Sequence, residues 1–265
     1  MNAYIILLLI AGQGILVSAT AVAQPGNANR NTEQQVIRLL NKADDVLSKY
    51  QYDLRRNDSV RSVENAIMKT LLAGLKKSPS SIDYPFNQLR KRFIKIATSM
   101  DGRMRTYSWD VQDGATERSI CTIVQYRTQQ GIESSILHDG VNDMSEDPGT
   151  YYTRIHMVRN GDKVMYLAFG FSQYSTSNQS QRIRAFEIEG NRLVDTGKVF
   201  KQEGATVNEL EIYYDLFSYL KHGKPAIHFD PTSRFLYVPI TRLDKFILPR
   251  YRKYYFSRDI FRENP

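Results

Sequence analysis

The chain has 265 residues, of which 42% are hydrophobic, and it carries a formal net charge of +8. This length and apolar content suffice for one large domain or two small ones, and they exclude an extensively disordered protein. The single cysteine, Cys121, excludes an intramolecular disulfide, so packing must stabilise the fold. The positive charge suits anionic glycan, anionic lipid or nucleic acid, although we interpret it mainly as a means of solubility.

The N-terminus predicts export. The run AYIILLLIA at residues 3–11 and the run ILVSATAVA at residues 15–23 are separated by Gly-Gln-Gly. Each is shorter than the roughly 20 apolar residues of a membrane span, and Ala21 and Ala23 fit a signal-peptidase site. We expect a signal peptide at residues 1–23, no transmembrane segment after its cleavage, and a periplasmic, cell-surface or secreted protein. An uncleaved anchor is the alternative.

Residues 32–77 have helical periodicity. After a flexible tail at 24–31, Thr32 is placed to cap a first helix, and the Asn-Asp pair at 57–58 is placed to cap a second. Apolar residues recur at helical spacing at Val36, Leu39, Leu40, Ala43, Val46, Leu47 and Tyr50, and again at Val60, Val63, Ile67, Leu71, Leu72 and Leu75. One apolar stripe on each helix predicts a helical hairpin that packs on another element.

From Arg92 onward, after a linker expected at 78–91, short runs rich in aromatic and β-branched residues alternate with turn signals. We predict strands at 92–98, 103–109, 119–127, 151–158, 163–171, 182–189, 192–200, 208–214, 225–229, 234–240 and 245–256. Val164–Phe171 is apolar on both faces, which predicts a central covered strand. The fold class is therefore α+β, with the hairpin packed on an antiparallel β-meander at 92–265, as a sandwich or partial barrel.

The segment TSMDGRMRTYSWD, residues 98–110, predicts a hairpin turn at Asp101-Gly102. Along the following strand, Arg103, Arg105, Tyr107 and Trp109 point to one side. Arg105, Tyr107 and Trp109 are candidate ligand-binding residues, because rings stack on bases or sugars and guanidinium groups hold anions. The interpretation that we favour is that the rings anchor the sheet against the helices.

The C-terminal run RYRKYYFSRDIFR, residues 250–262, interleaves basic and aromatic side chains. Its candidate ligand-binding residues are Arg250, Arg252 and Lys253, which would suit an anionic polymer or lipid headgroups. The interpretation that we favour is a last edge strand whose charges prevent edge-to-edge pairing.

Motifs for catalysis and metal binding are weak. The four histidines lack zinc-site spacing, and Cys121 lies in an alternating strand, where we expect a buried thiol. The acids of residues 138–149 do not match a calcium motif and predict a solvated loop. Carboxylates near Asp110 could pair for glycoside hydrolysis. We expect no catalytic residue, no metal and no cofactor.

The strings SMDGRMRTYSWD, DPGTYYTRIH and KVMYLAFGFS resemble a family of uncharacterised exported proteins of Gram-negative bacteria that share a Ser-x-Asp-Gly…Tyr-Ser-Trp-Asp strand. The similarity runs from about residue 32 to the C-terminus. The resemblance implies a signal peptide, a helical N-terminal part and a β-rich remainder. It implies no catalytic residue.

These features favour a non-catalytic binding or assembly module of the bacterial cell envelope. Its expected partner is a glycan, an envelope component or another protein, and we do not expect nucleic acid. One alternative is a polymer-degrading hydrolase that uses paired carboxylates. The other is an anionic-polymer binder that uses the basic and aromatic C-terminus.

Overall fold

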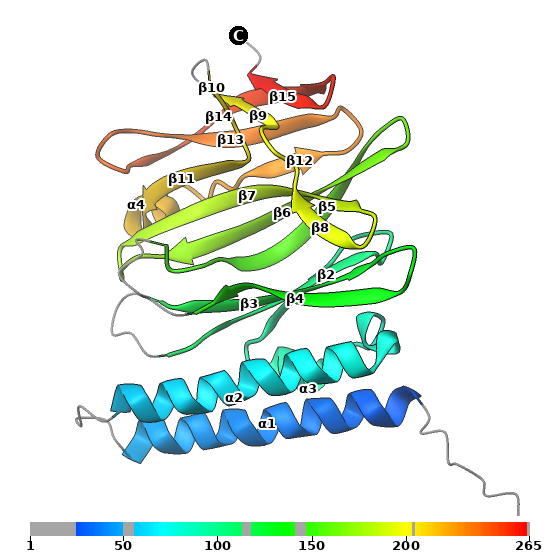
Figure 1. Cartoon of the computed structure of the whole chain (residues 1–265). Coiled ribbons are helices and arrows are strands. Elements are labelled where there is room, and N and C mark those ends of the chain that lie inside the picture. The colour runs from blue at the N-terminus through cyan, green and yellow to red at the C-terminus, as the bar shows by residue number, and fades with distance from the viewer. Residues whose placement is uncertain (1–24, 50–55, 113–117, 141–146, 203–204, 264–265) are drawn as a thin grey trace, which may run out of the picture.

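The computed structural model describes residues 25–49, 56–112, 118–140, 147–202 and 205–263. In chain order, a helix pair is followed by a four-stranded, a five-stranded and a six-stranded sheet, which stack as layers (Figure 1). The fold is therefore α+β, as predicted, with mostly antiparallel sheets, none of which closes into a barrel. The expected signal peptide lies outside the described residues. Within the described ranges, no helix is long and apolar enough to cross a membrane.

The helix pair consists of α1 (Pro25–Lys49) and α2 (Arg56–Lys77), which pack against each other. Their predicted apolar stripes join one core with the first sheet, through Val36, Leu40, Ala43, Val63, Ile67, Leu71 and Leu75. Helix α1 begins at Pro25, a residue well suited to a first helical position. Residues 25–31 are therefore helical and do not form the expected flexible tail. Thr32 donates to the carbonyl oxygen of Ala28 inside the helix, so it is not a cap.

Gly74 of α2 packs closely against Thr32 of α1. A Cβ at this position would lie 2.2 Å from Cγ2 and 2.5 Å from Oγ1 of Thr32. Gly74→Ala gains about 1 kcal/mol of helix propensity, but it forces the helices or Thr32 to move. We expect a net loss of about 1–3 kcal/mol in the free energy of unfolding. Gly26→Ala in α1 is the control, because a Cβ there meets nothing within 4 Å. Equal urea midpoints for the two variants would contradict this packing.

The segment expected to be a linker is packed against α1. It contains a 3₁₀ turn, η1 (Pro79–Ile82), and a short helix, α3 (Asn87–Lys91). The buried carboxylate of Glu33 accepts hydrogen bonds from the Tyr84 hydroxyl at 3.2 Å and from the backbone N–H groups of Gln88 and Leu89 at 2.7 and 3.2 Å. Residues 78–91 therefore pack against the helices and are not a free linker.

The first sheet has the order β1 (Lys95–Thr98), β2 (Met104–Asp110), β3 (Ile120–Arg127), β4 (Ile132–Asp139). Both faces are covered: Tyr107 and Trp109 of β2 pack with the helices, whereas Met104 packs with the second sheet. This confirms the predicted alternation along β2. Strand β4 was not predicted, because its sequence IESSILHD carries few β-branched or aromatic residues.

The middle sheet has the order β11 (Glu209–Asp215), β7 (Asn178–Glu189), β6 (Lys163–Gln173), β5 (Tyr151–Asn160), and β8 (Arg192–Asp195) pairs with β7. Strand β6 lies between β5 and β7 with apolar residues buried on both faces, which confirms the prediction for Val164–Phe171. The Tyr166 hydroxyl donates to Oδ2 of Asp101 at 2.8 Å and so ties this sheet to the β1–β2 turn.

The last sheet has the order β10 (Ala205–Val207), β9 (Phe200–Gln202), β15 (Ile260–Glu263), β14 (Ile247–Ser257), β13 (Phe235–Thr241), β12 (His228–Asp230). A helix that was not predicted, α4 (Leu216–Lys221), follows β11. The C-terminal run forms β14 and β15, and β14 pairs with β13 on one side and β15 on the other. The expectation of a last edge strand was therefore wrong for most of this run.

Candidate functional site

The candidate residues of β2 lie inside the protein. Arg105, Tyr107 and Trp109 are 4%, 0% and 3% exposed. The Trp109 indole N–H donates to Oε2 of Glu64 at 2.9 Å, and the Tyr107 hydroxyl donates to Oε1 of Gln125 at 3.0 Å. These positions match the interpretation that the rings anchor the first sheet against the helices, and they leave no ring of β2 open for stacking a polymer.

Arg105 stabilises the same junction between the helices and the first sheet by hydrogen bonds to backbone carbonyl groups. Its Nη1 donates to the carbonyl oxygens of Ser81, Ile82 and Tyr84 at 3.2, 2.7 and 2.6 Å. Its guanidinium also lies 5.9 and 5.5 Å from the ring centres of Phe86 and Tyr107. The contacts of Arg105 are thus with the protein itself.

Among the described residues, the surroundings of Asp110 do not supply the acid pair that a hydrolase needs. Asp110 accepts from Arg118 Nη1 at 2.6 Å and from the backbone N–H of Gln112 at 2.9 Å. Beside it lies a cavity of about 410 Å³ in which, among the described lining residues, Asp110 is the only carboxylate. The described part of the chain therefore places no second acid opposite Asp110 in this cavity.

Other reactive groups are also engaged or buried. Burial raises the pKa of the Cys121 thiol, so it stays protonated and unreactive. Asp147 of the predicted acidic loop pairs with Arg182 at 2.7 Å, whereas Asp143 and Glu146 lie outside the described residues. Nowhere in the described ranges do three or more potential metal ligands gather.

The C-terminal candidates point to opposite sides of β14. Lys253 lies on the outer side of the last sheet with Tyr251 and Tyr255, each of which is 36% exposed. Arg250 and Arg252 alternate to the other side, where the Nε of Arg252 lies 3.8 Å from Oε1 of Glu263. The three predicted residues therefore do not form one site.

Lys253 instead belongs to a group of exposed and partly exposed rings that we call the aromatic face. In register with β14, Phe235 pairs with Tyr255, Tyr237 with Lys253, and His228 with Tyr237. The aromatic face consists of His228, Phe235, Tyr237, Tyr251, Lys253 and Tyr255. On the same outer side of the sheet, Tyr255 is paired with Arg262 of β15, and Arg262 is paired with Lys201 of β9. The aromatic face therefore joins three neighbouring strands of an open sheet.

The rings of the aromatic face hold one another in place. The His228 imidazole stacks on Tyr237 with the ring centres 4.6 Å apart and the planes 6° from parallel. Tyr251 meets both rings edge-on at 5.3 and 6.4 Å. The Nζ of Lys253 lies 5.7 Å from the centre of the Tyr237 ring. Such a platform can stack against flat or ring-shaped groups while its cation attracts negative charge.

The described residues of the aromatic face and its strands include no pair of acids. Among the described outward-pointing residues of its strands, Asp230 is the single carboxylate. Hydrogen bonds from the Ser233 hydroxyl and the Thr232 N–H lower the pKa of Asp230. Asp230 is therefore ionised at neutral pH and is not suited to act as a general acid.

Sequence reasoning found Lys253 and the tyrosines of the C-terminal run, but it did not group them with His228 and Phe235. The usable signal is the shared alternation of FLYVP and YRKYY, in which every second residue is a ring, a lysine or a proline. Register between β12, β13 and β14 decides which of these side chains meet, and register is set by tertiary pairing.

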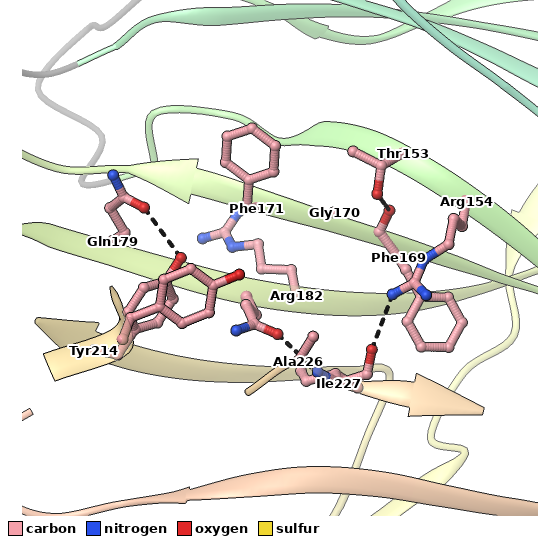
Figure 2. Close-up of a pocket in the computed structure, with 12 residues that line it drawn as sticks. Thr153, Arg154, Phe169, Gly170, Phe171, Gln179, Arg182, Tyr214, Ala226 and Ile227 are labelled. Atoms are coloured by element: carbon pink, nitrogen blue, oxygen red, sulfur yellow. Dashed lines mark hydrogen bonds between the residues drawn. The ribbon is translucent and has the colours of Figure 1, made fainter. Parts of the chain in front are cut away.

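A separate cavity of about 290 Å³ lies against the middle sheet (Figure 2). Strands β5, β6, β7 and β11, helix α4 and residues 226–227 contribute its walls. Arg182 lies at this cavity, but it forms ion pairs with Glu211 at 2.8 Å and with Asp147 at 2.7 Å.

Comparison of the chain with family models, curated proteins and solved structures finds no match.

Proposed function

We propose that the protein is an exported, non-catalytic binding module of the bacterial cell envelope and that the aromatic face holds an acidic glycan. The observation that carries this proposal is the set of mutually packed rings around Lys253 on the outer side of an open sheet. The apolar N-terminal sequence and the resemblance to exported Gram-negative proteins support the envelope location.

A sugar polymer fits this surface because each sugar ring has an apolar side that can lie on an aromatic ring. Among the described residues of its strands, the outer side also carries Lys201, Lys253 and Arg262 against one carboxylate, Asp230. This excess of positive charge favours a chain with carboxylate or sulfate groups over a neutral one. The shallow shape of a sheet face suits a long polymer better than a small molecule.

The proposal predicts that Lys253→Gln and Tyr251→Ala weaken binding to polygalacturonate, measured by affinity electrophoresis. We expect a loss of about two- to fivefold for Lys253→Gln, because an exposed cation contributes little. For Tyr251→Ala we expect about five- to 50-fold, because a stacked ring contributes more. Dextran, which is neutral, should be retained less than polygalacturonate by the native protein.

Arg250→Gln is the matched control, because it removes the same charge from the same strand on the opposite side. Tyr213→Ala removes a ring that is exposed elsewhere, on β11. Both controls should bind like the native protein. Equal losses for Lys253→Gln and Arg250→Gln would show that only net charge matters. If the protein binds a single-stranded oligonucleotide more tightly than polygalacturonate, the ligand of the aromatic face is nucleic acid and not a glycan.

A further inference from the structure

The cavity of about 290 Å³ against the middle sheet is close to the lower end, about 300 Å³, of ordinary small-molecule sites. In Figure 2, Arg154 and Phe169 lie at one end of the cavity and Tyr214 lies at the other. Its remaining walls come from strands β5, β6 and β7, from Tyr219 of α4 and from residues 226–227.

The walls of the cavity are held by their own hydrogen bonds. Gln181 donates from Nε2 to the carbonyl oxygen of Pro225 at 2.9 Å and accepts from the N–H of Ile227 at 2.7 Å, which fixes the 225–227 segment to the sheet. The Tyr214 hydroxyl donates to Oε1 of Gln179 at 3.1 Å. The cavity is therefore formed before any ligand arrives, which lowers the entropic cost of binding.

Arg154 supplies a positive charge that the described protein does not neutralise. Its Nη2 donates to the carbonyl oxygen of Ile227 at 3.1 Å, and its guanidinium lies 5.5 Å from the centre of the Phe169 ring. Among the described residues no carboxylate pairs with Arg154, and none lines the cavity. The remaining N–H groups of Arg154 are thus available to an anion, for which a guanidinium is well shaped.

Tyr219 adds a second donor. Its ring packs on Tyr214 with the centres 4.8 Å apart, so Tyr219 belongs to the end of the cavity opposite Arg154. No described residue accepts a hydrogen bond from this hydroxyl. Burial raises the pKa of Tyr219, so the hydroxyl remains a proton donor at neutral pH. Arg154 and Tyr219 therefore offer donors at the two ends of the cavity, and Phe169 and Tyr214 offer ring surfaces beside them.

We infer that this cavity binds a small organic carboxylate that carries a ring, with the carboxylate at Arg154 and the ring among the aromatic walls. This site is separate from the aromatic face, and the inference does not rest on the proposed function. It adds a small-molecule ligand to a protein that we otherwise describe as a polymer binder.

The test uses benzoate, phenylacetate and cyclohexanecarboxylate, each compared with its neutral amide by isothermal titration calorimetry. We expect at least one acid to bind, and to bind about tenfold or more tightly than its amide, because a charge-assisted hydrogen bond is lost in the amide. Arg154→Gln should weaken that acid about 10- to 100-fold, whereas Tyr219→Phe, at the other end of the cavity, should bind it like the native protein. Arg154 is exposed and Tyr219→Phe removes a single hydroxyl, so we expect native thermal unfolding for both variants.

Arg159→Gln is the matched control, because it removes an equally exposed arginine from the same strand, β5. It should bind the acid like the native protein. Three results would overturn the inference. They are that none of the acids binds at millimolar concentration, that an acid and its amide bind equally, or that Arg154→Gln and Arg159→Gln lose equal affinity. Arg154→Gln should retain polygalacturonate binding, and Lys253→Gln should retain acid binding, so the two sites fail or succeed independently.

Discussion

Replacing Trp109 with alanine should lower the free energy of unfolding by about 3–5 kcal/mol. The indole is 3% exposed and packs in the core that joins the helices to the first sheet. Its loss leaves a large cavity there and removes the N–H that Glu64 accepts at 2.9 Å. Glu64 itself is 4% exposed, so the carboxylate loses a donor in a place where water cannot replace it.

The measurement is urea unfolding followed by circular dichroism, with Trp109→Phe and Glu64→Gln as comparison variants. Trp109→Phe keeps a ring and loses the donor, and Glu64→Gln keeps an acceptor, so both should cost less than Trp109→Ala. Trp109 is the only tryptophan, and its native fluorescence should therefore resist quenching by iodide. Strong quenching in the folded protein would contradict the buried position and would reopen the case for a ligand platform on β2.

Replacing Arg105 with methionine should cost about 3–4 kcal/mol. A hydrogen bond from a charged donor contributes about 1.5–3 kcal/mol, and Arg105 Nη1 donates to the carbonyl oxygens of Ser81, Ile82 and Tyr84. Methionine fills much of the same volume but leaves these carbonyl groups without that donor. Arg105→Lys should not restore stability, because an ammonium group lacks the planar guanidinium that packs near the rings of Phe86 and Tyr107.

Arg103→Met is the control for Arg105, because Arg103 precedes the same strand and its Nη2 donates to one carbonyl oxygen, that of Arg127, at 3.3 Å. We expect a cost below about 1 kcal/mol for this partly exposed residue. Limited proteolysis should cut residues 78–91 faster in Arg105→Met than in the native protein. If Arg103→Met and Arg105→Met lower the unfolding midpoint equally, the buried hydrogen bonds of Arg105 are not what holds this segment.

Much of the architecture follows from local pattern. The two helical stripes, the turn at Asp101-Gly102 and the doubly apolar strand at Val164–Phe171 all depend on spacings of a few residues. The elements that were missed lack such a pattern. Strand β4 is rich in polar residues, and α4 (Leu216–Lys221) is too short to show a helical period. The parallel pairing of β15 with β9 joins segments about 60 residues apart, which no local pattern reports.

Local sequence pattern was enough to predict the secondary structure of most elements and the side of β2 on which Tyr107 and Trp109 lie, because the side-chain periods of helices and strands are properties of the local backbone. Which rows of rings are covered depends instead on how the layers pack. Helices pack on the row of β2 and bury it, whereas β14 belongs to the last layer and keeps Tyr251, Lys253 and Tyr255 at the surface (Figure 1). Burial depends on contacts between distant segments, and a similar alternation of rings and cations therefore became a structural core in one strand and an exposed face in the other.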